Sequence, residues 1–191
     1  VKALRKNTTT LPDMNVKTLA DKKNIIKSKD NAFELEMDIT PNITGITGIE
    51  LYNAKGENVK IYLDTKERKL VMDRTESGLI EFGKLSVPHD IEKNYADVHQ
   101  GAGNTPFRVF NSVNYKNDFA LGTWAPLSLC KGKTYHVDIF VDKCSVEIFV
   151  DGGRIAMTNL VFPTTPYTSF KFYNKGTSAS FHNIKISELS L

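Results

Sequence analysis

The feature that most constrains the fold of this chain is an alternation of apolar and polar residues with a period of two. Apolar residues occupy every second position in the three clearest runs, which are 33–39, 135–141 and 146–150. Successive side chains of a β-strand point to opposite faces, so each run predicts a strand with one face on a hydrophobic core. Further runs of this kind lie at 59–63, 170–172 and 181–189, and weaker ones at 49–51, 69–72 and 155–162.

Turn residues separate these predicted strands. Gly56 and the segment 65–68 interrupt the runs before residue 72, Asp142-Lys143 lies between two strong runs, and Asp151-Gly152-Gly153 follows the second of them. Glycine supplies the positive φ angles that tight hairpin turns need. Strands recurring about every ten residues without helices between them indicate antiparallel sheets. We therefore predict an all-β fold, an antiparallel two-sheet β-sandwich of the concanavalin- or galectin-like jelly-roll type.

The chain length favours one domain. A sequence of 191 residues buries enough surface for one core without a disulfide or metal, and β-sandwiches of this size are often single domains. Between residues 83 and 126 the chain carries Pro88, Pro106 and Pro126 among many polar and aromatic residues. A structureless loop of this length is uncommon in a compact domain, so we expect at least one strand there, at 108–113. The prediction is one β-sandwich domain over 1–191 with a loop-rich insertion at about 83–126.

Composition excludes several classes of protein. The 25 basic and 22 acidic side chains are interspersed, for a formal net charge of +3, and no basic cluster is present. This balance argues against a nucleic-acid partner. No apolar stretch approaches the roughly 18 residues of a membrane-spanning helix, which argues against a membrane protein.

Residue types that perform catalysis are present but not in catalytic patterns. Hydrolysis of a glycosidic bond needs two converging carboxyl groups, and the candidate acids are Asp73, Asp142, Glu147 and Asp151. Asp142 and Asp151 fall in turns, where aspartate bonds the local backbone, and Glu147 alternates against the core face of its strand. The four histidines lack metal-ligand spacing, and no nucleotide-binding or nucleophile motif occurs. We predict no catalytic residue, no metal and no cofactor in this chain.

The two cysteines, Cys130 and Cys144, flank a predicted strand. The strand would separate them by about 25 Å, whereas a disulfide needs Cα atoms within about 7 Å. We expect both to be free thiols that fill apolar space. Two sequons, Asn7-Thr8-Thr9 and Asn42-Ile43-Thr44, would matter only in a eukaryotic secretory host.

The segment 140–163 carries a more specific motif. It begins Phe-Val-Asp-Lys-Cys-Ser-Val-Glu-Ile-Phe-Val-Asp-Gly-Gly-Arg and ends in Phe-Pro. This segment resembles the signature of the carboxy-terminal β-sandwich domain of glycoside hydrolase family 32, which includes invertases, levanases and inulinases. The matching positions are Asp142, Ser145, Val146, Glu147, Phe149, Gly153, Thr158, Phe162 and Pro163.

Two further segments resemble the same family in the same order. Residues 70–78 contain Asp73-Arg74 and end in Ser77-Gly78, similar to the family's Leu-x-x-Asp-Arg-Ser-x-Ser-Gly. Leu4-Arg5 is similar to the junction at which the family's sandwich begins, so we expect Val1 to lie at a domain boundary.

The resemblance implies a division of labour. In the family, a preceding five-bladed propeller carries the nucleophile, the transition-state stabiliser and the acid/base, in Trp-Met-Asn-Asp-Pro-Asn-Gly, Arg-Asp-Pro and Glu-Cys motifs that are absent here. The implied parent is a retaining β-fructosidase, acting on sucrose, levan or inulin, that is extracellular or periplasmic. The implied role of this chain is a non-catalytic accessory domain whose partner, the catalytic propeller of the same protein, it stabilises.

Within the motifs we assign structural roles only. We predict that Arg74 pairs with Glu147 or Asp73, and that Asp142 and Glu147 serve as turn and salt-bridge residues at strand ends. Phe140 and Phe149 fall on the non-core face of the hairpin, where they either meet the propeller or cover the sheet beneath a loop.

The alternative function is that of a carbohydrate-binding module. Oligosaccharides stack on exposed aromatic rings, and Trp124, Tyr115 and Tyr95 lie in the polar insertion. Trp124 could instead close the edge of the sandwich. Self-association as a homo-oligomer through an exposed sheet edge or face is also left open.

Overall fold

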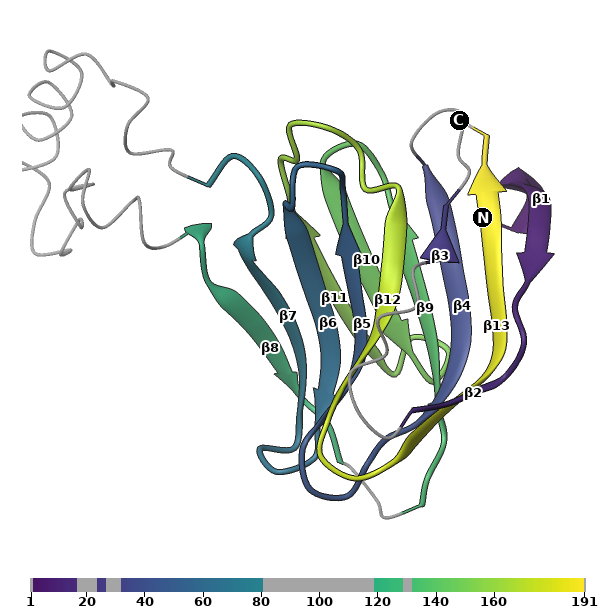
Figure 1. Ribbon diagram of the computed structural model, residues 1–191, viewed down its shortest axis with the longest axis vertical. Helices are drawn as coiled ribbons and strands as arrows, with labels where there is room; N and C mark the ends of the chain where they lie inside the picture. Colours follow the sequence, from purple (N-terminus) through teal and green to yellow (C-terminus); the bar gives the residue numbers. More distant parts are fainter. Residues whose placement is uncertain (1, 17–23, 27–31, 81–118, 129–131, 191) are drawn as a thin grey trace, which may run out of the picture.

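The structure is a computed structural model that describes residues 2–16, 24–26, 32–80, 119–128 and 132–190. Its strands form two antiparallel sheets, sheet A and sheet B, which are stacked as the two layers of a sandwich (Figure 1). The predicted all-β sandwich is thus confirmed. That 1–191 is one domain with an insertion remains a prediction.

Sheet A has the strand order β1-β13-β4-β9-β10-β11, and β2 pairs with the other end of β13. Its strands are β1 (Arg5–Thr10), β2 (Met14–Val16), β4 (Phe33–Thr40), β9 (Tyr135–Val141), β10 (Ser145–Val150), β11 (Ile155–Leu160) and β13 (Ala179–Leu189), and a 3-10 turn, η1 (Lys2–Leu4), precedes them.

Sheet B has the strand order β3-β12-β5-β6-β7-β8. Its strands are β3 (Asn24–Ile25), β5 (Ile46–Tyr52), β6 (Asn58–Asp64), β7 (Lys69–Glu76), β8 (Gly122–Pro126) and β12 (Ser169–Lys175). β8 forms one edge of this sheet, so the predicted insertion ends in a strand (Figure 1). The strand expected at 108–113 lies outside the described residues.

The core lies between the sheets and is built by the alternating apolar residues. On β4, Leu35 and Met37 are fully buried, whereas the intervening Glu36 is half-buried on the outer face. The two layers meet directly where the rings of Phe172 and Phe181 pack with centroids 4.5 Å apart. Alternation with a period of two therefore produces the sandwich because each sheet can bury only one face.

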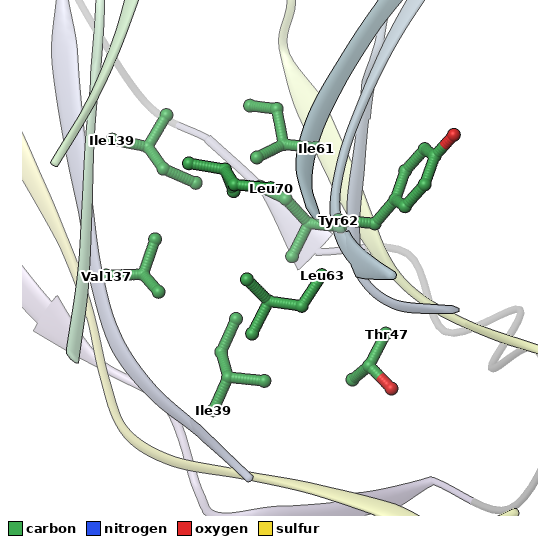
Figure 2. Close-up of a pocket in the computed structure, with 9 residues that line it drawn as sticks. Ile39, Thr47, Ile61, Tyr62, Leu63, Leu70, Val137 and Ile139 are labelled. Atoms are coloured by element: carbon green, nitrogen blue, oxygen red, sulfur yellow. The ribbon is translucent and has the colours of Figure 1, made fainter. Parts of the chain in front are cut away.

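The core leaves a small void of about 10 Å³, lined mainly by aliphatic side chains of both sheets, with Thr47 and Tyr62 at its border (Figure 2). The side chains around it include Ile39, Ile61, Leu63, Leu70, Val137 and Ile139. Such a space holds at most about one water molecule, and its lining offers that water few polar partners. This void is consequently a packing defect rather than a ligand site.

A buried polar cluster closes one end of the core. Asn42, Thr47 and Asn174 are each no more than 1% exposed. The Asn42 Nδ2 group donates to Asn174 Oδ1 at 2.7 Å and to Thr47 Oγ1 at 2.8 Å. The Thr47 hydroxyl in turn donates to Asn174 Oδ1 at 2.9 Å. Because the Asn42 amide is used in this way, the folded chain does not present its sequon for modification.

The turns follow the sequence prediction. Asp151, Gly152 and Gly153 have φ angles of 50°, 69° and 90°, as the tight β10–β11 hairpin requires. Cys144 is a free thiol, as expected, but it is exposed at a turn and does not fill apolar space. That part of the prediction was wrong because residues 142–144 cross from β9 to β10 at the surface. Cys130 lies outside the described residues.

Candidate functional site

The family-like segments 70–78 and 160–163 lie far apart in the sequence and meet at one end of the sandwich. We call residues 74–79 and 160–163 the motif junction. The Leu79 N–H donates to the Phe162 carbonyl at 2.8 Å. Gly78 has a φ of 126°, and a Cβ at that position would lie 2.4 Å from the Phe162 carbonyl oxygen. The two segments therefore form one contact, in which glycine is required.

The centre of the motif junction is buried. Ser77 is fully buried, and its carbonyl accepts a hydrogen bond of 2.6 Å from the Tyr167 hydroxyl. Burial, together with the nearby Glu57 charge, raises the pKa of Tyr167, which keeps that hydroxyl a donor. Tyr167 thus links the motif junction to the loop that leads into β12.

Arg74 does not form the predicted ion pair with Glu147 or Asp73. Its Nη1 group donates to the Leu160 carbonyl at 2.9 Å, and its guanidinium lies 4.2 Å from the centroid of the Phe119 ring. Burial lowers the pKa of Arg74. The prediction was wrong because Arg74 caps the last carbonyl of β11, an acceptor that sequence spacing cannot reveal. It joins the two motif segments through the backbone instead of through a carboxylate.

The other family-motif residues take turn or surface positions. Asp142 lies in the turn between β9 and β10, as predicted, and accepts from the Lys143 N–H group at 2.6 Å. Asp73 lies within strand β7 and accepts from the Thr75 N–H group at 3.0 Å. Glu147 lies on the outer face of sheet A opposite Phe140 and Thr158, and no described residue forms an ion pair with it. The predicted pairing of Glu147 with Arg74 is therefore wrong.

The remaining motif residues lie on the same hairpin or at its ends. Ser145 begins β10, Gly153 lies in the exposed turn after it, and Pro163 packs its Cα against Gly78. Phe149 packs edge-on against Phe140, with ring centroids 5.7 Å apart, and both rings are half-buried on the outer face of sheet A. The structure brings Asp73, Arg74 and Pro163 to the same end of the sandwich and leaves Gly153 at the other end.

Sequence reasoning missed an ionic network on the outer face of sheet A. Arg5 donates from Nε and Nη2 to the two carboxylate oxygens of Glu34, both at 2.5 Å, although Glu34 is only 1% exposed. Arg5 also lies 3.7 Å from Glu36, and ligand oxygens of Glu34, Glu36 and Asp138 lie within 4.8 Å of one another. The hydrogen bond to Glu34 raises the pKa of Arg5. The Arg5 guanidinium and the Lys185 ammonium on β13, which lies 2.9 Å from Glu36 Oε1, supply positive charge to Glu34 and Glu36.

The network continues to His136. Its Nδ1 lies 2.7 Å from Asp38 and its Nε2 lies 3.4 Å from Asp138. Burial opposes the charged imidazole, but the hydrogen bond to Asp38 and the surrounding carboxylates raise the pKa of His136. Burial and the charges of Glu34 and Glu36 raise the pKa of Asp138. The network thus links β1, β13, β4 and β9 through ion pairs between side chains on the outer face of sheet A.

A second feature that sequence reasoning missed lies on the outer face of sheet B. The strand registers place Tyr173, Gly48, Tyr62, Val71 and Trp124 side by side across β12, β5, β6, β7 and β8. We call these five residues the aromatic strip. Figure 2 shows the Tyr62 ring directed away from the core residues. Of these five residues, the sequence pointed only to Trp124, because the order of the strands, which the sequence does not reveal, brings the other four beside it.

Trp124 is 57% exposed, so it does not close the sandwich edge. The Lys69 ammonium lies 4.4 Å from the centroid of its ring. Tyr95 and Tyr115, the other two candidates for carbohydrate binding, lie outside the described residues. Within the described part of the chain, no helix is long and apolar enough to cross a membrane.

Solved structures of larger enzymes contain the same sandwich. The chain matches the exo-inulinase of Aspergillus awamori with a TM-score of 0.62 at 16% identity, covering 97% of this chain and 29% of that one. It matches the sucrose-6-phosphate hydrolase of Lactobacillus gasseri with a TM-score of 0.57 at 20% identity, covering 99% of this chain and 29% of that one. At these identities the likeness establishes the fold.

Sequence comparison supplies the family. The chain is 35% identical over 95 residues to the levanbiose-producing levanase of Bacillus subtilis (strain 168), covering 50% of this chain and 17% of that protein. It is 22% identical over 170 residues to the levanase of Bacillus sp. (strain L7), covering 87% of this chain and 15% of that protein. It thus spans less than a fifth of either relative. Residues 1–188 match the family described as "Glycosyl hydrolases family 32 C terminal", and the chain therefore belongs to the C-terminal domain family of the family 32 glycosyl hydrolases.

Proposed function

We propose that this chain is the non-catalytic accessory domain of a retaining β-fructosidase and that it packs against the catalytic propeller of the same protein and stabilises it. The relatives are larger proteins of which this domain covers only a part, which supports a catalytic domain beside it. Two of those relatives are named levanases, which favours levan, or another β-fructoside such as sucrose or inulin, as the substrate of the parent enzyme. An extracellular or periplasmic location follows from the same proposal, because levan is a polymer.

The observation that carries the proposal is a group of exposed leucines beside the motif junction. Leu79, Leu121 and Leu160 are 43%, 49% and 51% exposed. Leu79 and Leu160 belong to the motif junction, and Leu121 precedes Gly122, which pairs with Asp73. Exposed apolar side chains that gather at one place on a domain favour an interface, and domain interfaces bury on the order of 600–1,500 Å².

The test compares the longer protein with variants at these leucines. Replacing Leu79 and Leu160 together by serine should lower the melting temperature of the propeller, because the interface would lose apolar contact. Ile43→Ser is the matched control, since Ile43 is 52% exposed at the opposite end of the sandwich. Calorimetry of the full protein and of the propeller alone gives the reference values.

A second arm measures activity. The 191-residue chain alone should release no sugar from sucrose, inulin or levan, whereas the full protein should. Turnover by the chain alone would contradict the non-catalytic role. A propeller that is equally stable without this domain would contradict the stabilising role.

Carbohydrate binding through Tyr95 and Tyr115 stays a prediction on residues that the structure does not describe. Trp124 is a separate case, because the structure describes its surroundings.

A further inference from the structure

The aromatic strip on the outer face of sheet B takes no part in the proposed contact with the propeller. The Tyr62 and Tyr173 rings lie with centroids 6.0 Å apart, on either side of Gly48. A Cβ on Gly48 would lie 1.9 Å from the Ile61 carbonyl oxygen, so no side chain fits between the two rings. Val71 then connects Tyr62 to the exposed Trp124. Tyr62 and Trp124 belong to strands two places apart, which separates them by about 10 Å.

Charged residues border the aromatic strip on both sides, and the positive and negative charges are close to equal in number. The bordering lysines are Lys60, Lys69, Lys171 and Lys175, and the bordering carboxylates are Glu50, Asp64 and Asp73. Glu76 lies one row farther out, opposite Asn58, and pairs with Lys60. Several of these charged residues are already paired, as in Lys171–Glu50 at 3.1 Å and Lys60–Glu76 at 3.5 Å. A balanced border creates no strong field, so the surface favours neither a polyanion nor a polycation.

The border also keeps hydrogen-bond acceptors in place. Asp64 Oδ1 accepts from the Lys66 and Glu67 N–H groups at 3.0 and 2.9 Å, and Asp73 Oδ1 accepts from the Thr75 N–H and hydroxyl groups at 3.0 and 2.7 Å. In both carboxylates these bonds orient the group and leave Oδ2 without a partner among the described residues. Val71 lies between the two, on the strand that carries Asp73.

We propose that the aromatic strip binds a neutral oligosaccharide chain, with Trp124 and Tyr62 as the stacking surfaces and Asp64 and Asp73 as hydroxyl acceptors. A sugar ring has an apolar face of C–H groups, which packs on an aromatic ring, and a rim of hydroxyls, which donate to carboxylates. The spacing of about 10 Å between the strands that carry the two rings is about the length of a disaccharide. A stable protein interface takes about 20–30 residues a side, whereas the aromatic strip has five residues.

The stacking residues of the proposed site lie apart from the proposed interface with the propeller, and only the acceptor Asp73, which pairs with Gly122, adjoins it. The aromatic strip occupies the outer face of sheet B, whereas the leucines of the proposed interface lie at the end of the sandwich beside the motif junction. Failure of one proposal therefore leaves the other unaffected.

The chain offers a direct probe, because Trp124 is its one tryptophan. Tryptophan fluorescence of the 191-residue chain should change saturably on titration with levan-type or inulin-type oligosaccharides, or with malto-oligosaccharides if recognition extends to other neutral sugars. Dextran sulfate, a polyanion, should produce no saturable change. The oligosaccharide that gives the strongest response then serves for calorimetry.

Calorimetry of variants assigns the site. Trp124→Ala should weaken binding about tenfold or more, Trp124→Phe should restore part of it, and Tyr62→Leu should weaken it as well. Ile43→Ala, at an exposed residue before β5 and three strands from Trp124 on β8, should bind as the original chain does. Trp124 is exposed on an edge strand, so its variants should remain folded, which circular dichroism checks.

Three results would overturn the proposal. They are the absence of a saturable change with every neutral oligosaccharide, unchanged binding by Trp124→Ala, and fluorescence that depends on protein concentration without sugar. The last result would mean that a second copy of the chain covers the strip.

Discussion

Arg5 at the start of β1 and Glu34 on β4 form a bidentate ion pair across the intervening strand β13, with both hydrogen bonds at 2.5 Å. Glu34 is almost completely buried, and Arg5 is the only described cation within salt-bridge distance of it. Arg5, from the Leu4-Arg5 segment that resembles the family junction, thus connects the edge strand β1 to the inner strand β4 of sheet A. This relationship gives the motif arginine a structural role.

Removal of Arg5 should destabilise the domain strongly. Arg5→Ala leaves the Glu34 carboxylate buried without its countercharge, which costs about 3 kcal/mol. Urea unfolding should show this loss in the free energy of unfolding. Lys6→Ala, at the exposed neighbouring position, should change it by less than about 0.5 kcal/mol. Equal behaviour of the two variants would show that the ion pair is not formed.

Replacement of Asp138 by asparagine should stabilise the domain at neutral pH. Asp138 lies directly opposite Glu36, and like charges in that position repel. Because the folded-state pKa of Asp138 is raised, the folded protein binds its proton more tightly than the unfolded chain, so its charge opposes folding at pH 7. We expect a gain of about 0.5–1 kcal/mol at pH 7 that shrinks toward pH 4. A lower melting temperature for Asp138→Asn at pH 7 would contradict this reading.

Protonated His136 should stabilise the folded domain, so its contribution to stability should be larger at acidic than at alkaline pH. Its folded-state pKa is raised, so its stabilisation is fully present below about pH 6.5 and is lost as the pH rises through the raised value. The melting temperature of His136→Gln should fall below that of the original chain at pH 5.5 by more than it does at pH 8.5. Both values come from scanning calorimetry. Added salt at pH 5.5 should reduce the difference, since the side chain is partly exposed.

Gly78 should tolerate no side chain. Its φ of 126° and the approach of Phe162 and Pro163 predict a loss of about 2–4 kcal/mol for Gly78→Ala. Gly56→Ala is the matched control, because Gly56 also has a positive φ, of 82°, but nothing lies within 4 Å of its added Cβ. That variant should lose only about 1 kcal/mol. If urea unfolding gave equal losses in the free energy of unfolding for the two variants, the close contact of Gly78 with Phe162 and Pro163 would not contribute to stability.

Asn42 should be essential for stability although it lies outside every motif. Asn42→Ala leaves the buried Thr47 and Asn174 polar groups short of partners, which costs about 2–4 kcal/mol. Thermal unfolding monitored by circular dichroism measures the loss. Asn15→Ala, at an exposed position on β2, should melt within about a degree of the original chain.

The prediction from sequence succeeded where the physical cause is local. Alternation on β4, β9 and β10 predicted strands with a buried face, and Asp151-Gly152-Gly153 predicted a tight turn, because side-chain periodicity and glycine φ angles act within a few residues. The same logic failed for Arg74, since its partner is a backbone carbonyl 86 residues away. It also failed for Cys144, whose exposure depends on where the turn meets the surface.

By itself, the sequence determined the fold class, the family and the strands whose apolar residues alternate, because these follow from periodicity and from motifs read along the chain. It gave no sign of the edge strands β1, β3 and β8 or of the short strand β2. Only the tertiary structure decided which distant segments meet. The order of strands brought Arg5 to Glu34, Gly78 to Phe162, and Tyr62 into line with Trp124. The physical reason is that pairing between strands brings together residues whose separation in sequence carries no information about their neighbours across a sheet.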